Sequence, residues 1–363
     1  ITFGTLQSTP TPTLITENRD KFLWPFSSTS IWNMPIGSGA QFVDPMFQTP
    51  SDGYGVDEEV INLDPNGPLQ YIALHSWPAS CPGLGTWDDT PQMTSTRVHI
   101  TDSYVTSTLD GIYPNMAGGL LDVNGKIQEV NYATRCTAGG ALYVGSTSEA
   151  IRGTLDLYGD GLEAERGISA WGGHGGSMLS GVGGSIRKGE LLSAQPIRHA
   201  IKFNIDMGFY GKRSGVENAH VWPAFVADDS SSQTYGACSD GVSGNEIIAM
   251  GALLAIPSTT DINTLGLESN PAKKLAWTLQ NYGGYVVDND GGGNCNWWHR
   301  GIMPEHGVIQ EMEAVGISMT GPGVWQRDMD KLFKALRIVI NNNSTSIGGG
   351  GTPLQPLAPP ISN

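Results

Sequence analysis

The chain has few charged residues, and most of these are acidic. Only 15% of its 363 residues are Asp, Glu, Lys or Arg, and 20 basic residues against 35 acidic ones give a formal net charge of −15. Such a surface repels nucleic acids and anionic membranes, and no basic run offsets the repulsion. We therefore expect neither as a partner.

Long hydrophobic runs and common enzyme motifs are also lacking. No segment reaches the roughly 18 apolar residues that a membrane-spanning helix needs, so no span is predicted. The absence of HExxH, GxxxxGK[ST], GxSxG and a helix-opening GxGxxG weighs against phosphoryl transfer, dinucleotide binding and the common hydrolase elbow. No repeat of fixed period is present, which disfavours propellers and solenoids.

Cysteine is scarce, and the four cysteines are far apart: Cys81, Cys136, Cys238 and Cys295. Without a CxxC pair, a zinc ribbon or a thioredoxin-type site is not expected. Two disulfides fit better, with three pairings open, and four buried free thiols are the alternative. The Thr/Pro-rich start at Ile1, without an initiating Met, is typical of a processed terminus, so we expect a secreted, extracellular protein.

Glycine and proline, in contrast, are abundant. The 49 glycines and 22 prolines suit many short strands joined by turns. We predict one mainly β domain over residues 22–340, a jelly-roll-like β-sandwich with a few peripheral helices. Residues 1–21 are interpreted as a Thr/Pro-rich arm and residues 341–363 as a Gly/Pro-rich tail, through which copies could self-assemble.

Three segments carry clear local signals. Asp122–Gly125 contains the Asn-Gly signal of a β-hairpin. A helix is predicted with Asn270 as its N-cap, Pro271 at its first helical position and Gly283 at its C-terminal cap. A second amphipathic helix is predicted from about Asp328.

The stretch from Trp171 to Asn204 holds two of the seven histidines among glycines. Such glycine runs predict either a loop set against a ligand or a series of tight turns. Small residues on both sides of His174 leave its ring accessible to a substrate. His174 is therefore a candidate catalytic residue.

Alternation from Ile197 to Asn204 predicts a strand with one apolar face and one polar, basic face. His199 lies on the apolar face, so it is either a functional residue or a core histidine. Arg198 and Lys202 lie on the polar face, where they either clamp a substrate carboxylate or face solvent.

Carboxylates suggest a second kind of chemistry. Glycoside hydrolysis needs one protonated and one ionised carboxyl on opposite sides of the bond. Asp160, between two glycines, and Glu190 are the predicted pair, with Asp156 as a substitute. The alternative is β-elimination on a uronic-acid polymer, in which a base such as His174 or Tyr235 removes the C5 proton and a cation neutralises the sugar carboxylate.

Two further groups of residues complete the predicted site. Trp171 and Trp222 are expected to stack on sugar rings. Asp288 and Asp290, which follow a predicted strand and precede glycines, resemble the opening of a calcium loop. We expect no required cofactor beyond a structural calcium ion at these residues.

Several longer motifs resemble a group of secreted microbial proteins of uncharacterised function. They are YGDG at 158–161, GGHGGSMLSGVGGSIRKGEL at 172–191, IRHAIKFN at 197–204, HVWPA at 220–224 and KKLAWTLQNYGGYVVDND at 273–290. The resemblance covers roughly residues 22–300. It implies an extracellular setting and implies no particular activity.

These features together predict a secreted carbohydrate-active enzyme that cleaves a polysaccharide, with hydrolysis favoured. A polysaccharide lyase acting on a uronic-acid polymer is one alternative. A non-catalytic extracellular protein, either a carbohydrate-binding module or a surface or filament subunit, is the other.

Overall fold

The computed structural model describes residues 18–51, 53–75, 92–106, 116–145, 151–162, 172–212, 218–238, 247–290 and 300–361, and the statements below concern these residues. Their strands form three sheets, two of four strands and one of seven. Helices are short and few. The prediction of a mainly β fold with a few peripheral helices is confirmed.

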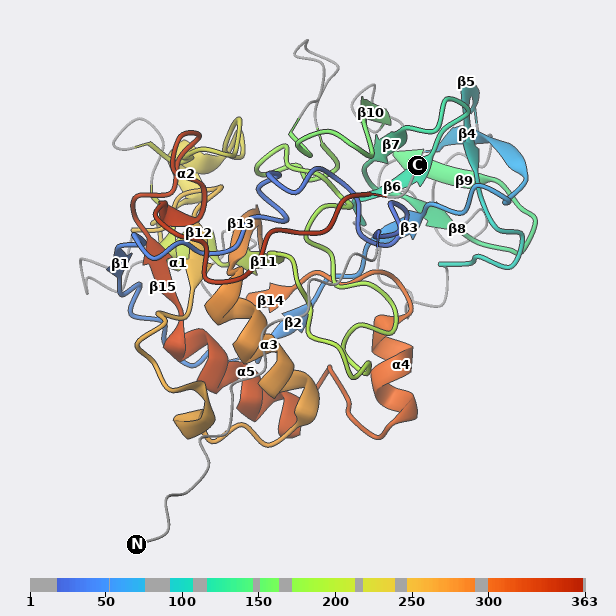
Figure 1. Cartoon of the computed structure of the whole chain (residues 1–363). Helices are drawn as coiled ribbons and strands as arrows, with labels where there is room; N and C mark the ends of the chain where they lie inside the picture. Colours follow the sequence, from blue (N-terminus) through green and yellow to red (C-terminus); the bar gives the residue numbers. More distant parts are fainter. Residues whose placement is uncertain are drawn as a thin grey trace, which may run out of the picture.

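The two four-stranded sheets form one side of the molecule (Figure 1). Their order is β10 (Ile151–Leu155), β7 (Ile127–Val130), β6 (Gly118–Leu121), β3 (Val60–Asn62) in the first, and β5 (Gln92–His99), β4 (Leu69–His75), β9 (Leu142–Gly145), β8 (Thr134–Arg135) in the second. Ile72, Leu120 and Val144 belong to one buried cluster that both sheets share. This half is a small β-sandwich, and Gly125, with φ of 74°, turns its predicted β6–β7 hairpin.

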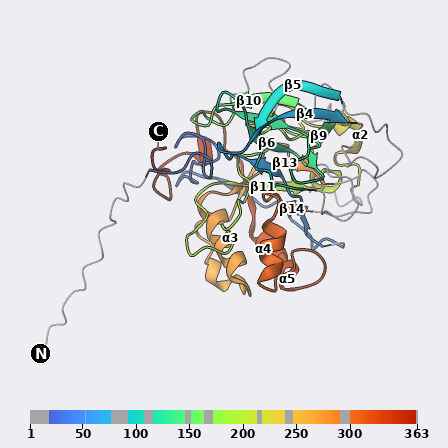
Figure 2. The same ribbon diagram turned by 90° about the vertical axis from the view of Figure 1, so that its right-hand side faces the viewer.

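The seven-stranded sheet lies beside the sandwich and is backed by helices. Its order is β1 (Phe42–Val43), β15 (Arg337–Val339), β12 (Leu253–Ala255), β13 (Gly284–Asn289), β11 (Ile201–Ile205), β14 (Arg300–Ile302), β2 (Gly55–Val56). The helices α3 (Asn270–Asn281) and α5 (Val324–Ala335) cover one face (Figure 2). Shorter helices are α1 (Met207–Tyr210), α2 (Ser231–Thr234), α4 (Val308–Ala314) and the 3₁₀ turns Ile262–Leu265 and Ile347–Gly349.

Strand β11 at the centre of this sheet has two different faces. Ile201, Phe203 and Ile205 pack into the cluster that includes the buried sides of α3 and α5, and the Phe203 ring lies 5.4 Å from that of Phe333. The other face carries Lys202 and is covered by the glycine-rich segment 172–187. The predicted alternation is therefore confirmed, with the polar face buried instead of exposed.

The boundaries of the predicted elements shift by a few residues. The helix predicted from Asn270 has Ser269 as its N-cap, because the Ser269 hydroxyl accepts a hydrogen bond from the Ala272 N–H. Helix α5 begins at Val324, ahead of the predicted start at Asp328. Strand β11 is shorter than predicted because the Ala200 N–H donates to the Trp32 carbonyl, outside the sheet.

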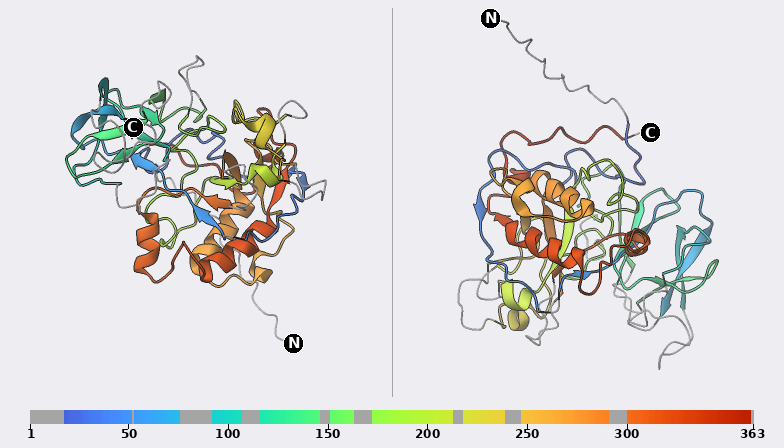
Figure 3. Two further views of the ribbon diagram at one scale, coloured as in Figure 1. Left: turned by 180° about the vertical axis from the view of Figure 1, so that it is seen from behind. Right: turned by 90° about the horizontal axis from the view of Figure 1, so that it is seen from below.

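The C-terminal segment is not a detached tail. Residues 341–361 run along the domain (Figure 3), where the Leu354 N–H donates to the Ile36 carbonyl and Ala358 is buried. The Arg19 N–H donates to the Pro360 carbonyl near the other end of the chain. These residues therefore pack against the domain, and most of the predicted N-terminal arm lies outside the described residues.

Two other predictions can be compared with the structure. Within the described ranges, no helix has both the length and the apolar character needed to cross a bilayer. Cys136 and Cys238 are not free thiols. Cys81 and Cys295 lie outside the described residues, so the disulfide pairing stays a prediction.

Candidate functional site

A network of buried charged groups lies on the polar face of β11. The Lys202 ammonium, which is completely buried, donates to Glu59 Oε1 at 2.5 Å and to the Ser180 carbonyl at 3.1 Å. His174 Nε2 lies 2.6 Å from the same Glu59 oxygen, and the Ser185 hydroxyl donates to the other. We call these five residues together with Glu129 the buried network.

Glu129 on β7 ties the glycine-rich segment into this network. Its carboxylate accepts hydrogen bonds from the Ser180 hydroxyl at 2.6 Å and from the N–H groups of Gly173 at 2.8 Å and Gly181 at 2.6 Å. A Cβ on Gly181 would lie 2.6 Å from the backbone nitrogen of Gly118. These glycines therefore allow close packing inside the protein, which supports the tight-turn interpretation of this segment.

Electrostatics within the network explain how it tolerates burial. Burial lowers the pKa of Lys202, although the Glu59 charge opposes that shift. Burial and the charge of Lys202 lower the pKa of His174, but contacts with Asp288 and Glu59 outweigh them and the net shift is upward. Burial raises the pKa of Glu129. Each ionised group thus has an opposite charge or several hydrogen bonds beside it.

A second group of acids, Asp57, Asp288 and Asp290, lies at the outer end of the network; we call it the outer carboxylate group. His174 Nδ1 is 3.6 Å from Asp288 Oδ2 and links the two groups. Asn204 Nδ2 donates to Asp57 Oδ2 at 3.1 Å.

Sheet geometry brings Asp288 to this place. The register of the parallel pair β11 and β13 shifts after Phe203, which pairs with Val286, so that Asn204 pairs with Asp288 and not with Val287. A bulge of this kind re-aims a side chain and is common beside functional sites. Both strands also end here, and the carboxyl ends of adjacent parallel strands are a usual location for ligand sites.

The outer acids affect one another strongly. Burial and the charge of Asp288 raise the pKa of Asp57 to about 7. Burial and the charges of Asp57 and Asp288 raise the pKa of Asp290 to about 8. The Asp288 side chain itself is 27% exposed and so reaches solvent. A protonated carboxyl beside a solvent-accessible carboxylate is a combination that acid–base catalysis uses.

The acids chosen from the sequence lie elsewhere. Asp156 and Asp160 are exposed, and each accepts a backbone N–H two residues ahead, from Tyr158 at 2.9 Å and Leu162 at 2.7 Å. They shape turns. Glu190 lies 3.2 Å from His199 Nε2 and also accepts a hydrogen bond from the Arg187 N–H. His174 lies in the buried network and is only 1% exposed, so its ring is not accessible as predicted. The pairing of Asp160 with Glu190 stays a prediction.

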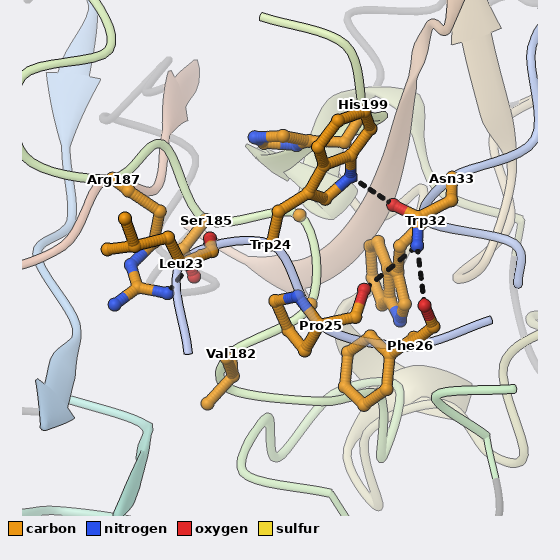
Figure 4. Close-up of a pocket in the computed structure, with 12 residues that line it drawn as sticks. Leu23, Trp24, Pro25, Phe26, Trp32, Asn33, Val182, Ser185, Arg187 and His199 are labelled. Atoms are coloured by element: carbon orange, nitrogen blue, oxygen red, sulfur yellow. Dashed lines mark hydrogen bonds between the residues drawn. The ribbon is translucent and has the colours of Figure 1, made fainter. Parts of the chain in front are cut away.

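His199 lines a different cavity, next to Trp24 and Arg187 (Figure 4). Its Nδ1 is 2.8 Å from the Ala200 carbonyl, and its side chain is 8% exposed. The cavity has a volume of about 20 Å³, which is room for about one water molecule. The structure thus favours the core interpretation of His199.

The burial and contacts of the other predicted binding residues also differ from what the sequence suggested. Lys202 is buried and cannot meet a substrate, while Arg198 is half-buried with its guanidinium 5.8 Å from the centre of the Trp24 ring. Tyr235 is buried, and its hydroxyl donates to Asp228 at 2.5 Å. Trp222 is half-buried. Trp171 lies outside the described residues.

Asp288 and Asp290, the predicted calcium ligands, do lie together in the outer carboxylate group. Across the described segments, however, no three His, Cys, Asp or Glu side chains are arranged to hold a metal ion. The structural calcium ion remains a prediction.

Sequence reasoning missed Asp57, Glu59, Glu129 and Asn204. The one available signal was the run of three acids at 57–59 between Val56 and Val60, because three adjacent carboxylates inside an apolar, strand-like segment are uncommon. Glu129 stands alone in its strand. No local pattern distinguishes it from a surface acid.

Comparison with known proteins adds no assignment: no family model matches the chain, and neither does any curated protein or solved structure. The resemblance to secreted microbial proteins therefore stays a prediction, and the functional argument depends on the site itself.

Proposed function

We propose that this chain is a carbohydrate-active enzyme that cleaves a polysaccharide by hydrolysis, with Asp57 as general acid and Asp288 as the second carboxylate. The observation that carries the proposal is the pairing of a carboxyl whose pKa is about 7 with a solvent-accessible carboxylate that helps to raise it. In glycosidases, likewise, one catalytic carboxyl is protonated and the other is ionised. The extracellular composition of the chain is consistent with a polysaccharide substrate.

The chemistry assigns a step to each residue. Protonated Asp57 gives its proton to the glycosidic oxygen, so the leaving sugar departs as a neutral alcohol. Asp288 either takes a proton from the attacking water or attacks the anomeric carbon itself, after which water releases the sugar from the enzyme. Both routes add one water across the cleaved bond.

His174 and Asn204 would position this pair. A protonated His174 directs its Nδ1–H toward Asp288, at 3.6 Å, while Glu59 holds the opposite ring nitrogen at 2.6 Å. Asn204 donates to Asp57 and fixes one of its oxygens. The buried network thereby serves as a rigid base for the outer carboxylate group.

A polysaccharide lyase is the less supported alternative. Lys202 is completely buried behind Glu59, and Tyr235 shares its hydroxyl proton with Asp228, so neither is free to act on a uronate. His174 is only 1% exposed, so it has no better access to a uronate. A protein that only binds carbohydrate is the third candidate, and the outer carboxylate group would then have no catalytic role.

Digestion of a panel of neutral and acidic glycans, with product mass spectrometry, tests the proposal. Asp57→Asn and Asp288→Asn should each lower the rate by about 10²–10⁴-fold, while Asp44→Asn, at an exposed aspartate paired with Arg337, is the matched control. Products with one added water support hydrolysis. Unsaturated products would indicate elimination, and no product from any glycan would reject the enzyme hypothesis.

A further inference from the structure

A groove separate from the outer carboxylate group lies along the edge of β3. Two adjoining pockets, of about 370 and about 390 Å³, share Asn62 and Lys188. One pocket continues between residues 101–105 and 306–310, and the other between residues 20–23 and 61–66. We call the combined depression the Lys188 groove. Each pocket is within the usual size range of sites for small organic ligands.

The acidic run at 57–59 separates this groove from the proposed catalytic side. Asp57 contacts Asn204 and Glu59 contacts His174, whereas Glu58 contacts His306 at 2.7 Å, in the wall of the groove. Alternate residues of an extended segment point to opposite sides. The groove and the outer carboxylate group therefore lie on opposite sides of one short segment.

The walls of the groove are held in place from within. The buried Glu58 carboxylate also accepts the N–H of Gly307 at 3.0 Å. His306 Nε2 lies 2.9 Å from the Val105 carbonyl, which joins the two walls of one pocket. A groove with fixed walls loses little entropy when a ligand binds.

The charged groups of the groove are largely neutralised. The Glu305 carboxylate accepts a hydrogen bond from Arg187 Nε at 2.7 Å, and its other oxygen lies 3.4 Å from the Lys188 ammonium. Asp64 accepts the Thr101 hydroxyl at 2.9 Å, and hydrogen bonds lower its pKa. Asp20 adds an exposed negative charge. A polyanion is thus not attracted to this groove.

Uncharged hydrogen-bonding groups remain at its surface. Ser103 and Gln310 are exposed in the groove, whereas Asn62 is buried and bonded to Thr101. The Lys188 side chain, 45% exposed, carries a charge where the two pockets meet. The Lys188 nitrogen also lies 5.8 Å from the centre of the Tyr104 ring. Hydrogen-bonding side chains in a nearly neutral groove match a ligand rich in hydroxyl groups.

We propose that the Lys188 groove is a second, non-catalytic binding site for an uncharged oligosaccharide segment. The choice of a carbohydrate rests on the proposed function, whereas the absence of a charge on the ligand follows from the groove. Such a site would hold a polymer at the surface of the protein while cleavage takes place on the other side of residues 57–59.

Calorimetric titration tests the groove apart from cleavage. The full chain carrying Asp57→Asn, in which we expect cleavage to be about 10²–10⁴-fold slower, is titrated with cellohexaose, xylohexaose and mannohexaose, and with an oligogalacturonate for contrast. At least one neutral hexamer should bind, and Ser103→Trp, which fills the groove, should weaken its binding by about tenfold or more. Gln195→Trp, at an exposed glutamine outside the groove, is the matched control.

Gln310→Ala provides a second, milder test, since it removes two hydrogen-bonding atoms without adding bulk. It should weaken binding of the same hexamer by about threefold to tenfold. The proposal is overturned if no neutral hexamer binds, if the oligogalacturonate binds better, or if Ser103→Trp folds and binds like the control. Because binding is measured without cleavage, these outcomes do not depend on whether the parent chain hydrolyses a glycan.

Discussion

Two groups of charged side chains meet on one face of the central sheet, and they are balanced differently. In the buried network, Lys202 and His174 both lie against Glu59, and Glu129 accepts three hydrogen bonds. In the outer carboxylate group, Asp57 and Asp290 have raised pKa values because they are buried and because neighbouring acids repel them. The first arrangement favours folding. The second costs stability and is typical of a reactive site.

Lys202→Met should show the largest effect. The change removes the buried cation and leaves Glu59 without its partner, which typically costs about 3–5 kcal/mol of unfolding free energy. Urea denaturation measures it. Lys273→Met, at an exposed lysine in α3, is the matched control and should stay within about 0.5 kcal/mol. If both variants unfold alike, the buried network does not stabilise the fold.

The pH dependence of stability should reflect the outer carboxylate group. The folded-state pKa of Asp57 is about 7 and that of Asp290 about 8, against an ordinary value of 3.8. Between these values the folded protein binds more protons than the unfolded chain, so the free energy of unfolding falls as pH rises. Protonated His174, whose pKa is also raised, adds a loss of the same sign.

We expect a fall of about 6 kcal/mol between about pH 5 and about pH 8, measured by urea denaturation at several pH values. Acids with a lowered pKa, such as Glu305, change the free energy of unfolding mainly below this pH window. Stability that rises with pH across the window would contradict the described electrostatics.

Asp57→Asn and Glu59→Gln should change stability in opposite directions although they are two residues apart. The first removes a charge that neighbouring acids repel, so it should stabilise the protein by about 1–2 kcal/mol near pH 8. The second removes the partner of Lys202 and should destabilise it by about 3 kcal/mol. Thermal unfolding at one pH compares them, and shifts of the same sign would show that the two groups do not differ.

Asp160→Asn should have the smallest effect. The side chain is exposed, and an Asn oxygen can still accept the Leu162 N–H, so we expect a change within about 0.5 kcal/mol and no change in glycan cleavage. The same digestion assay measures it. A loss of cleavage comparable with that of Asp57→Asn would restore the pair predicted from the sequence.

Particular elements show why prediction succeeded in some places. The Asn-Gly turn at 124–125 and helix α3 are determined by local chemistry, namely a glycine with positive φ and a proline in the first turn. The alternation of β11 also placed Phe203 and Lys202 on opposite faces correctly. What failed was the expectation that a polar face meets water, because burial of Lys202 depends on Glu59, which lies 143 residues away.

The mainly β class, the local turns and helices and the alternation of β11 could be predicted, because each depends on residues close together in the chain. The acids that lie beside His174 could not be predicted, because they come from distant segments. Asp57 directly follows the edge strand β2, and a bulge in the pairing of β11 with β13 places Asp288 opposite Asn204. The raised pKa of Asp57 comes from burial and from Asp288, and neither of these exists before the chain folds.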